Sequence, residues 1–138
     1  TNKNLKSINK HIEGVDLKEK INDLIPLANK INSITYIIKK IDYDGDLKKM
    51  GDEFLSAIKS KGFMLVGTVK NNKAMLMCAI TRDLTGKIQA GKVLSEISKV
   101  IEGGGGGKAH IATAGGRKKE MLEKALIDGE NLFKSLLI

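Results

Sequence analysis

Residues 103–116 read GGGGGKAHIATAGG and hold seven of the fifteen glycines in the chain. Because glycine lacks a Cβ, its backbone reaches positive φ and lets a ligand come close. A run of glycines can direct successive N–H groups at an anion. The pair Gly115-Gly116 precedes a predicted helix, whose N-terminus also favours negative charge. Lys108 and Arg117 add positive charge at either end. We therefore expect an anion-binding loop here.

Two common phosphate-binding motifs fit this segment poorly. A Walker A loop needs glycine where Glu102 stands and Ser or Thr where Ala109 stands. The dinucleotide fingerprint started at Gly103 fails at Lys108, and started at Gly104 it ends on the permitted Ala109. Both motifs follow a strand, whereas this segment follows a predicted helix. The alternative is a flexible glycine linker, which leaves the second glycine pair unexplained.

The flanking sequence predicts an α/β fold: a mixed sheet of about four or five strands with packing helices. Periodicity and turn residues predict strands at 33–41, 63–70 and 73–81, with Asn71-Asn72 as a hairpin turn, and an extended piece at 109–114. Helices are expected at 47–61, capped by Asp46 and stopped by Gly62, at about 90–102, and at 117–137.

A short helical arm is predicted at residues 1–32, before a globular glycine-rich domain at 33–138. Apolar residues recur at helical spacing in the arm, and Pro26 interrupts the pattern. An ordinary packing helix explains the same pattern equally well.

Composition favours an anionic partner. The chain has 138 residues, is 41% hydrophobic and 29% charged, and carries a net charge of +8. Residues 103–119 contain four basic residues and no acid, whereas nine of the sixteen acids lie in 13–53. No apolar run approaches the roughly 18 residues of a membrane span, and residues 1–15 lack the apolar core of a signal peptide. The chain does not begin with Met, which fits either a fragment of a larger protein or a processed chain.

No catalytic or metal site is predicted. Cys78 is the only cysteine and is expected to be a buried core residue, and His11 and His110 are the only histidines. His110 titrates near neutrality and is a general acid–base candidate, although hydrogen bonding or contact with RNA is the better interpretation. Asp42, Asp44 and Asp46 alternate as in a calcium loop, but the rest of that motif is missing, which favours a turn and a helix cap.

The glycine-rich segment resembles the signature near the C-terminus of alanyl-tRNA synthetases. Residues 80–94, ITRDLTGKIQAGKVL, look like the segment that precedes it there, and the resemblance covers roughly residues 33–135. The domain is shared with the DHH phosphoesterases, in which a histidine directly follows the glycines. Lys108 in that position favours the synthetase branch. Arg117-Lys118-Lys119 departs from the many synthetases with an acidic or hydroxyl residue after the second glycine pair.

The resemblance implies a tRNA-binding accessory domain of an alanine–tRNA ligase. Such a domain contacts the outer corner of tRNA, helps couple aminoacylation with editing, and often mediates dimerisation, here through the arm or the last helix. It implies a cytoplasmic protein that contacts no membrane, with no catalysis and no cofactor in this domain, and with ATP, Mg²⁺ and zinc in the parent enzyme. The alternatives are the substrate-binding subdomain of a DHH-type phosphoesterase acting on nucleotides or short oligonucleotides, and an oligomerisation module.

Few aromatic residues are available for base stacking, so we expect recognition of RNA shape and phosphates, with salt-sensitive affinity. The predicted RNA-binding residues are Gly103, Gly104, Gly105, Gly106, Gly107, Lys108, His110, Arg117, Lys118, Lys119, Arg82 and Lys87.

Overall fold

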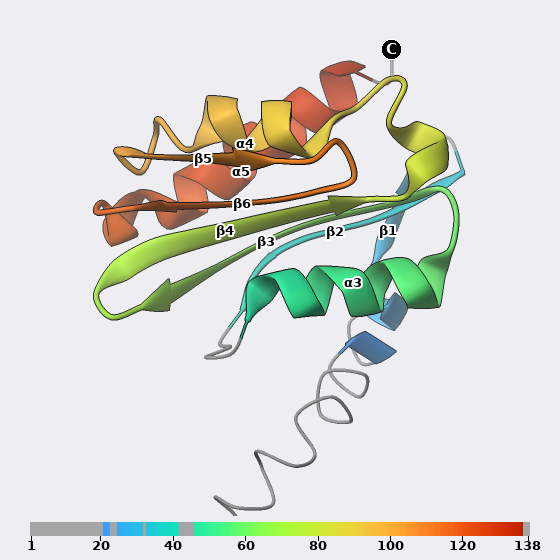
Figure 1. Ribbon diagram of the computed structural model, residues 1–138, viewed down its shortest axis with the longest axis horizontal. Helices are drawn as coiled ribbons and strands as arrows, with labels where there is room; N and C mark the ends of the chain where they lie inside the picture. Colours follow the sequence, from blue (N-terminus) through green and yellow to red (C-terminus); the bar gives the residue numbers. More distant parts are fainter. Residues whose placement is uncertain (1–20, 23–24, 32, 42–45, 137–138) are drawn as a thin grey trace, which may run out of the picture.

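The computed structural model describes residues 21–22, 25–31, 33–41 and 46–136. These residues form a six-stranded mixed sheet with the order β1-β2-β3-β4-β6-β5 (Figure 1). The strands are β1 (Asn29–Ile31), β2 (Ile34–Lys40), β3 (Gly62–Lys70), β4 (Lys73–Ile80), β5 (Gly103–Gly107) and β6 (Ile111–Gly116). Strands β2 and β3 are parallel, and every other neighbouring pair is antiparallel. The predicted α/β fold is confirmed. The described sheet also contains two strands that the sequence did not predict, β1 and β5.

Helices cover both faces of the sheet (Figure 1). Helix α3 (Leu47–Ile58) lies on one face, and α4 (Ala90–Ile97) and α5 (Leu122–Leu136) lie on the other. Alternate residues of each strand face opposite sides, so the two layers have separate apolar cores. Under α3, Met50 and Phe54 pack with Met64, Val66 and Met77.

The core beneath α4 and α5 is built around Phe133. Its ring stacks on Phe63 with centroids 4.1 Å apart and lies tilted against Tyr36 at 5.1 Å. All three residues are buried, which fixes α5 on β2 and β3. Cys78 lies in the same core as expected, and burial raises the pKa of its thiol.

The predicted helix ends at residues 61, 102 and 117 are wrong. Helix α3 ends at Ile58, because Lys59 and Lys61 take positive φ values of 69° and 49° and lead the chain into β3. Helix α4 ends at Ile97 and is followed by turns to residue 102. After β6, the chain forms a short 3-10 helix at Lys119–Met121, and α5 begins only at Leu122.

Two local predictions are confirmed in detail. The Asp46 carboxylate accepts a hydrogen bond from the Lys48 N–H at 2.9 Å and caps α3. Asn71 and Asn72 take positive φ values of 53° and 68° at the β3–β4 hairpin. Asp42 and Asp44 lie outside the described residues.

The predicted arm at 1–32 is described only in its last part. Residues 1–20 lie outside the described residues. Ile21 is buried in the core under α3, Pro26 lies in a 3-10 helix at Ile25–Leu27, and Asn29–Ile31 pair with β2 as an edge strand. The sheet therefore begins within the segment assigned to the arm.

Asp83 joins the end of β4 to the turn before β3. Its carboxylate accepts a hydrogen bond from the Lys61 N–H at 3.0 Å, and the Thr81 hydroxyl accepts one from the Gly62 N–H at 3.0 Å. A hydrogen bond from Thr81, followed by the one from Lys61, holds the pKa of Asp83 below its ordinary value. This network stabilises the left-handed conformation of Lys61.

We expect Asp83→Ala to lower the free energy of unfolding by about 1 kcal/mol at neutral pH, because the Lys61 N–H loses its acceptor. Since the folded state lowers the Asp83 pKa, its contribution is present above the unfolded pKa of about 4 and disappears as pH falls through the folded pKa. Urea unfolding of both proteins should therefore differ at neutral pH and converge in acid. The matched control is Asp128→Ala, which removes a surface ion pair within α5. A pH-independent difference for Asp83→Ala would contradict the assignment.

Candidate nucleic-acid interface

The glycine run forms strand β5, and the predicted loop with converging N–H groups is wrong. Strand β5 pairs antiparallel with β6, from Gly103 opposite Gly116 to Gly107 opposite Ala112. The Lys108 N–H donates to the Ile111 carbonyl at 2.9 Å. Because hydrogen-bonded pairs alternate, Gly106 and Gly104 also direct their peptide groups to β6. Successive N–H groups in a strand point in opposite directions, so they cannot converge on one anion.

Helix α4 lies along β5 and is tied to it at both ends (Figure 1). The Ala90 N–H donates to the Ala109 carbonyl at 2.8 Å, and the Gly103 N–H donates to the Ser98 carbonyl at 2.9 Å. A Cβ at Gly91 would lie 3.0 Å from the Gly107 carbonyl oxygen. Helix and strand backbones therefore approach each other directly.

The five glycines of β5 fall into two sets with a period of two. A Cβ at Gly103 or Gly105 would collide with the backbone of β6, and one at Gly107 would lie 2.9 Å from the Ile111 oxygen and the Ala112 Cα. A Cβ at Gly104 or Gly106 would meet nothing within 4 Å. The fold thus requires glycine at three of the five positions, and the other two expose bare backbone on the α3 side.

Three cations gather at the Lys108 end of β5. Lys48 on α3, Arg82 after β4 and Lys108 are exposed, and none of them makes an ion pair with another described residue. Burial contributes most to a lowered pKa of His110. The positive charges of Arg82, Lys108 and Lys48 lower this pKa further, and Asp52 raises it. The imidazole is therefore neutral at neutral pH, and the cluster carries a net positive charge.

Lys48 and Lys108 share a hollow of about 190 Å³ between α3 and the β5–β6 ribbon. Its remaining lining residues are Gly106, Gly107, Ile111, Ala112 and Thr113. The lining thus combines two cations with the open face of the glycine strand and includes no acidic residue.

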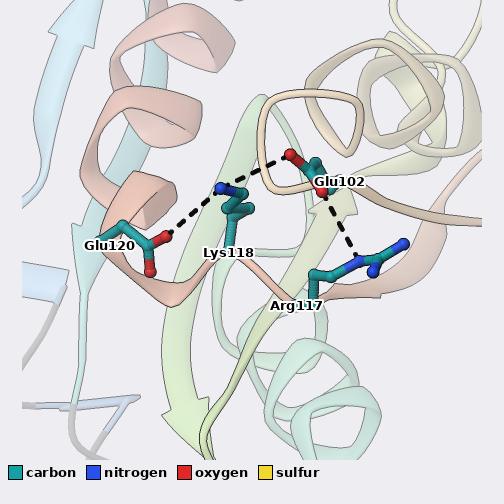
Figure 2. Close-up of polar contacts among 4 residues, drawn as sticks. All are labelled: Glu102, Arg117, Lys118 and Glu120. Atoms are coloured by element: carbon teal, nitrogen blue, oxygen red, sulfur yellow. Dashed lines mark ion pairs between the residues drawn. The ribbon is translucent and has the colours of Figure 1, made fainter.

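The basic residues after β6 lie at the opposite end of β5, roughly 13 Å away along a five-residue strand. Arg117 and Lys118 both pair with Glu102, at 3.5 and 3.7 Å, and Lys118 also approaches Glu120 at 3.9 Å (Figure 2). Lys119 donates to the Asn72 side chain at 2.6 Å. The charge of Arg117 and Lys118 is thus partly compensated within the fold, whereas Lys119 bonds a neutral amide.

Lys87 belongs to a different hollow from Lys108. It lines a hollow of about 370 Å³ between α4 and α5, together with Lys92, Leu132 and Leu136. The predicted residues therefore divide into three places: the Lys108 end with His110 and Arg82, the Arg117–Lys119 end, and Lys87.

Sequence reasoning missed Lys48, which stands far from the glycines in the chain and reaches them only through the packing of α3 on the sheet. Nothing near Lys48 in the sequence marks it as part of the site. In the described part of the chain, no three His, Cys, Asp or Glu residues gather as a metal site requires. No helix among the described residues is long and apolar enough to cross a membrane.

The model of the DHHA1 domain matches residues 31–135. Alanine–tRNA ligase of Anaeromyxobacter dehalogenans is 36% identical over 105 residues, which are 75% of this chain and 12% of that protein. Alanine–tRNA ligase of Natranaerobius thermophilus is 31% identical over 121 residues, which are 86% of this chain and 14% of that protein. The chain thus spans a small part of the length of these curated relatives.

The crystal structure of the C-Ala domain from Aquifex aeolicus alanyl-tRNA synthetase has the same fold. It superposes with a TM-score of 0.63 at 24% sequence identity, and the match covers 80% of this chain and 96% of that chain.

We expect Gly105→Ala to lower the free energy of unfolding by about 1–3 kcal/mol, because the new Cβ collides with the backbone of β6. Gly104→Ala should be neutral or stabilising by up to about 1 kcal/mol, since its Cβ meets open space and alanine restricts the unfolded chain. Urea unfolding monitored by circular dichroism measures both, with Gly86→Ala as a second open position. Equal losses at positions 104 and 105 would contradict the two-set assignment.

Proposed function

The chain belongs to the DHHA1 domain family, and from this premise we propose that it is the tRNA-binding accessory domain of an alanine–tRNA ligase. Similarity to two alanine–tRNA ligases over most of this chain supports the assignment. The observation that carries it is the cluster of Lys48, Arg82 and Lys108 at one end of β5. These cations have no acidic partner among the described residues, whereas Arg117 and Lys118 do.

Phosphate groups neutralise such a cluster of cations. Three cations brought together on a rigid sheet edge repel one another, and an anion relieves that repulsion. They come from α3, from the turn after β4 and from the end of β5, so their spacing is fixed by the fold. A fixed pattern of cations favours a folded RNA with phosphates at matching positions over a flexible polyanion.

We further propose that the RNA contact is to the outer corner of tRNA, where it helps couple aminoacylation with editing in the parent enzyme. The activity, the cytoplasmic location and the ATP, Mg²⁺ and zinc of that enzyme belong to the same proposal. Dimerisation through the arm or the last helix belongs to the same proposal.

Lys48→Ala with Lys108→Ala should weaken tRNA binding by roughly tenfold or more and reduce the slope of log affinity against log salt by about one per lysine. The measurement is fluorescence anisotropy with labelled alanine tRNA over a salt series, against an RNA duplex of equal phosphate number.

The matched control is Lys99→Ala with Lys124→Ala, which removes the same charge from two surface ion pairs on the α4 and α5 side. This control should bind like the wild type. Equal losses of tRNA affinity in both double variants would mean that binding depends only on the net charge of the protein. Binding of mononucleotides in place of tRNA would favour the phosphoesterase alternative.

Arg117→Ala should cost less tRNA affinity than Lys108→Ala, because Glu102 already compensates the Arg117 charge. The same titration measures both single variants, and each of them removes one positive charge. A larger loss for Arg117→Ala would move the interface to the opposite end of β5.

A further inference from the structure

Resting on the proposed function, we propose that the hollow between α3 and β5 holds one unpaired nucleobase of the RNA. The base lies on the side-chain-free face of β5, and Lys48 and Lys108 contact the phosphates that flank it. This adds a base contact to the shape and phosphate recognition expected from the sequence.

The floor of the hollow suits a planar ring better than a phosphate. The peptide groups of Gly104 and Gly106 are directed along the sheet to β6, so this face offers no N–H donors to an anion. Ile111, whose side chain lies on the α3 side, and the glycine Cα atoms make the surface largely apolar. With about 190 Å³ of space, it accommodates a heterocycle, whose faces are also apolar and flat.

The open glycines make this approach possible. Gly106 pairs with Thr113 and Gly104 pairs with Gly115, and cross-strand partners share a face of the sheet. That face lies beside α3, where a Cβ at either glycine would project into open space. Glycine within a strand commonly marks a place where a ligand comes close to the backbone. Thr113 makes no hydrogen bond that restrains its hydroxyl among the described residues, so it can bond the edge of the base.

Charge decides where the RNA backbone runs. The two lysines lie on the rim of the hollow, within reach of the phosphates on either side of a base that enters it. A neighbouring hollow of about 380 Å³ shares Thr113 but is bordered by Asp46 as well as Lys70. The Asp46 carboxylate disfavours phosphate there, so the backbone follows the Lys48 and Lys108 side.

The test fills the hollow without changing charge. Gly106→Val places a branched side chain over the floor, Gly106→Ala a small one, and Gly86→Ala is the matched control at an open position outside the hollow. Each variant is first compared with the wild type by thermal unfolding. Affinity for alanine tRNA and for an RNA duplex of equal phosphate number is then measured over a salt series.

We expect Gly106→Val to weaken tRNA binding by roughly tenfold, the scale of one lost stacked base, with an unchanged salt slope and unchanged duplex binding. Gly106→Ala should give a smaller loss, and Gly86→Ala none. Wild-type affinity for tRNA in Gly106→Val overturns the inference, as does an equal loss for tRNA and duplex or a reduced salt slope, which marks a phosphate contact. A wild-type protein that binds tRNA no better than duplex overturns the proposed function itself, which separates the two failures.

Discussion

The close approach of β5 to β6 and α4 is the constraint on which the rest of the structure depends. Gly103 and Gly105 lie against the backbone of β6 too closely for any side chain, and a Cβ at Gly91 of α4 would lie 3.0 Å from the Gly107 carbonyl oxygen. Hydrogen bonds at both ends then fix the helix along the strand. Because α4 carries Val93, Leu94 and Ile97 into the core, its position on β5 sets the packing of that face. Strand β5 is the last strand of the described sheet, and the helix that lies along it protects an edge that would otherwise be open to pairing.

The same strand also separates two groups of cations. A rigid ribbon holds Lys108 at one end and Arg117 at the other, and the turn at Glu102, with φ of 52°, brings an acid to the Arg117 end only. The Lys108 end instead receives Lys48 from α3 and Arg82 from the turn after β4. Asp83, next to Arg82, is held by the Lys61 N–H, so the turn that carries Arg82 is anchored to β3. The electrostatic difference between the ends is therefore a consequence of the topology.

Local signals carried most of the fold prediction. The Asn71-Asn72 turn, the Asp46 cap and the β-branched strands act through neighbouring residues, and the structure confirms them. Strand β5 escaped prediction because five glycines have a poor intrinsic preference for strands, and only pairing with β6 and packing against α4 make them one. The left-handed Lys61 before β3 depends likewise on Asp83, which is distant in sequence. For the site, sequence reasoning treated the basic residues as one surface, and whether they bind RNA stays a prediction. Their division between two ends of a strand, and the arrival of Lys48, follow from long-range packing.

Packing explains Gly103, Gly105 and Gly107 but leaves Gly104 and Gly106 without a structural reason. A glycine within a strand costs about 0.5–1 kcal/mol relative to alanine, because it loses more backbone entropy on folding. Two glycines with open surroundings therefore lower stability by about 1–2 kcal/mol with no compensation in the fold. Positions that break a local rule without a structural gain are expected at functional sites. Both positions face the side of the sheet where Lys48 and Lys108 meet, and Gly106 lines their hollow. The glycine run thus combines two requirements with a period of two: Gly103, Gly105 and Gly107 allow the close approach of β5 to β6, and Gly104 and Gly106 leave room for a ligand.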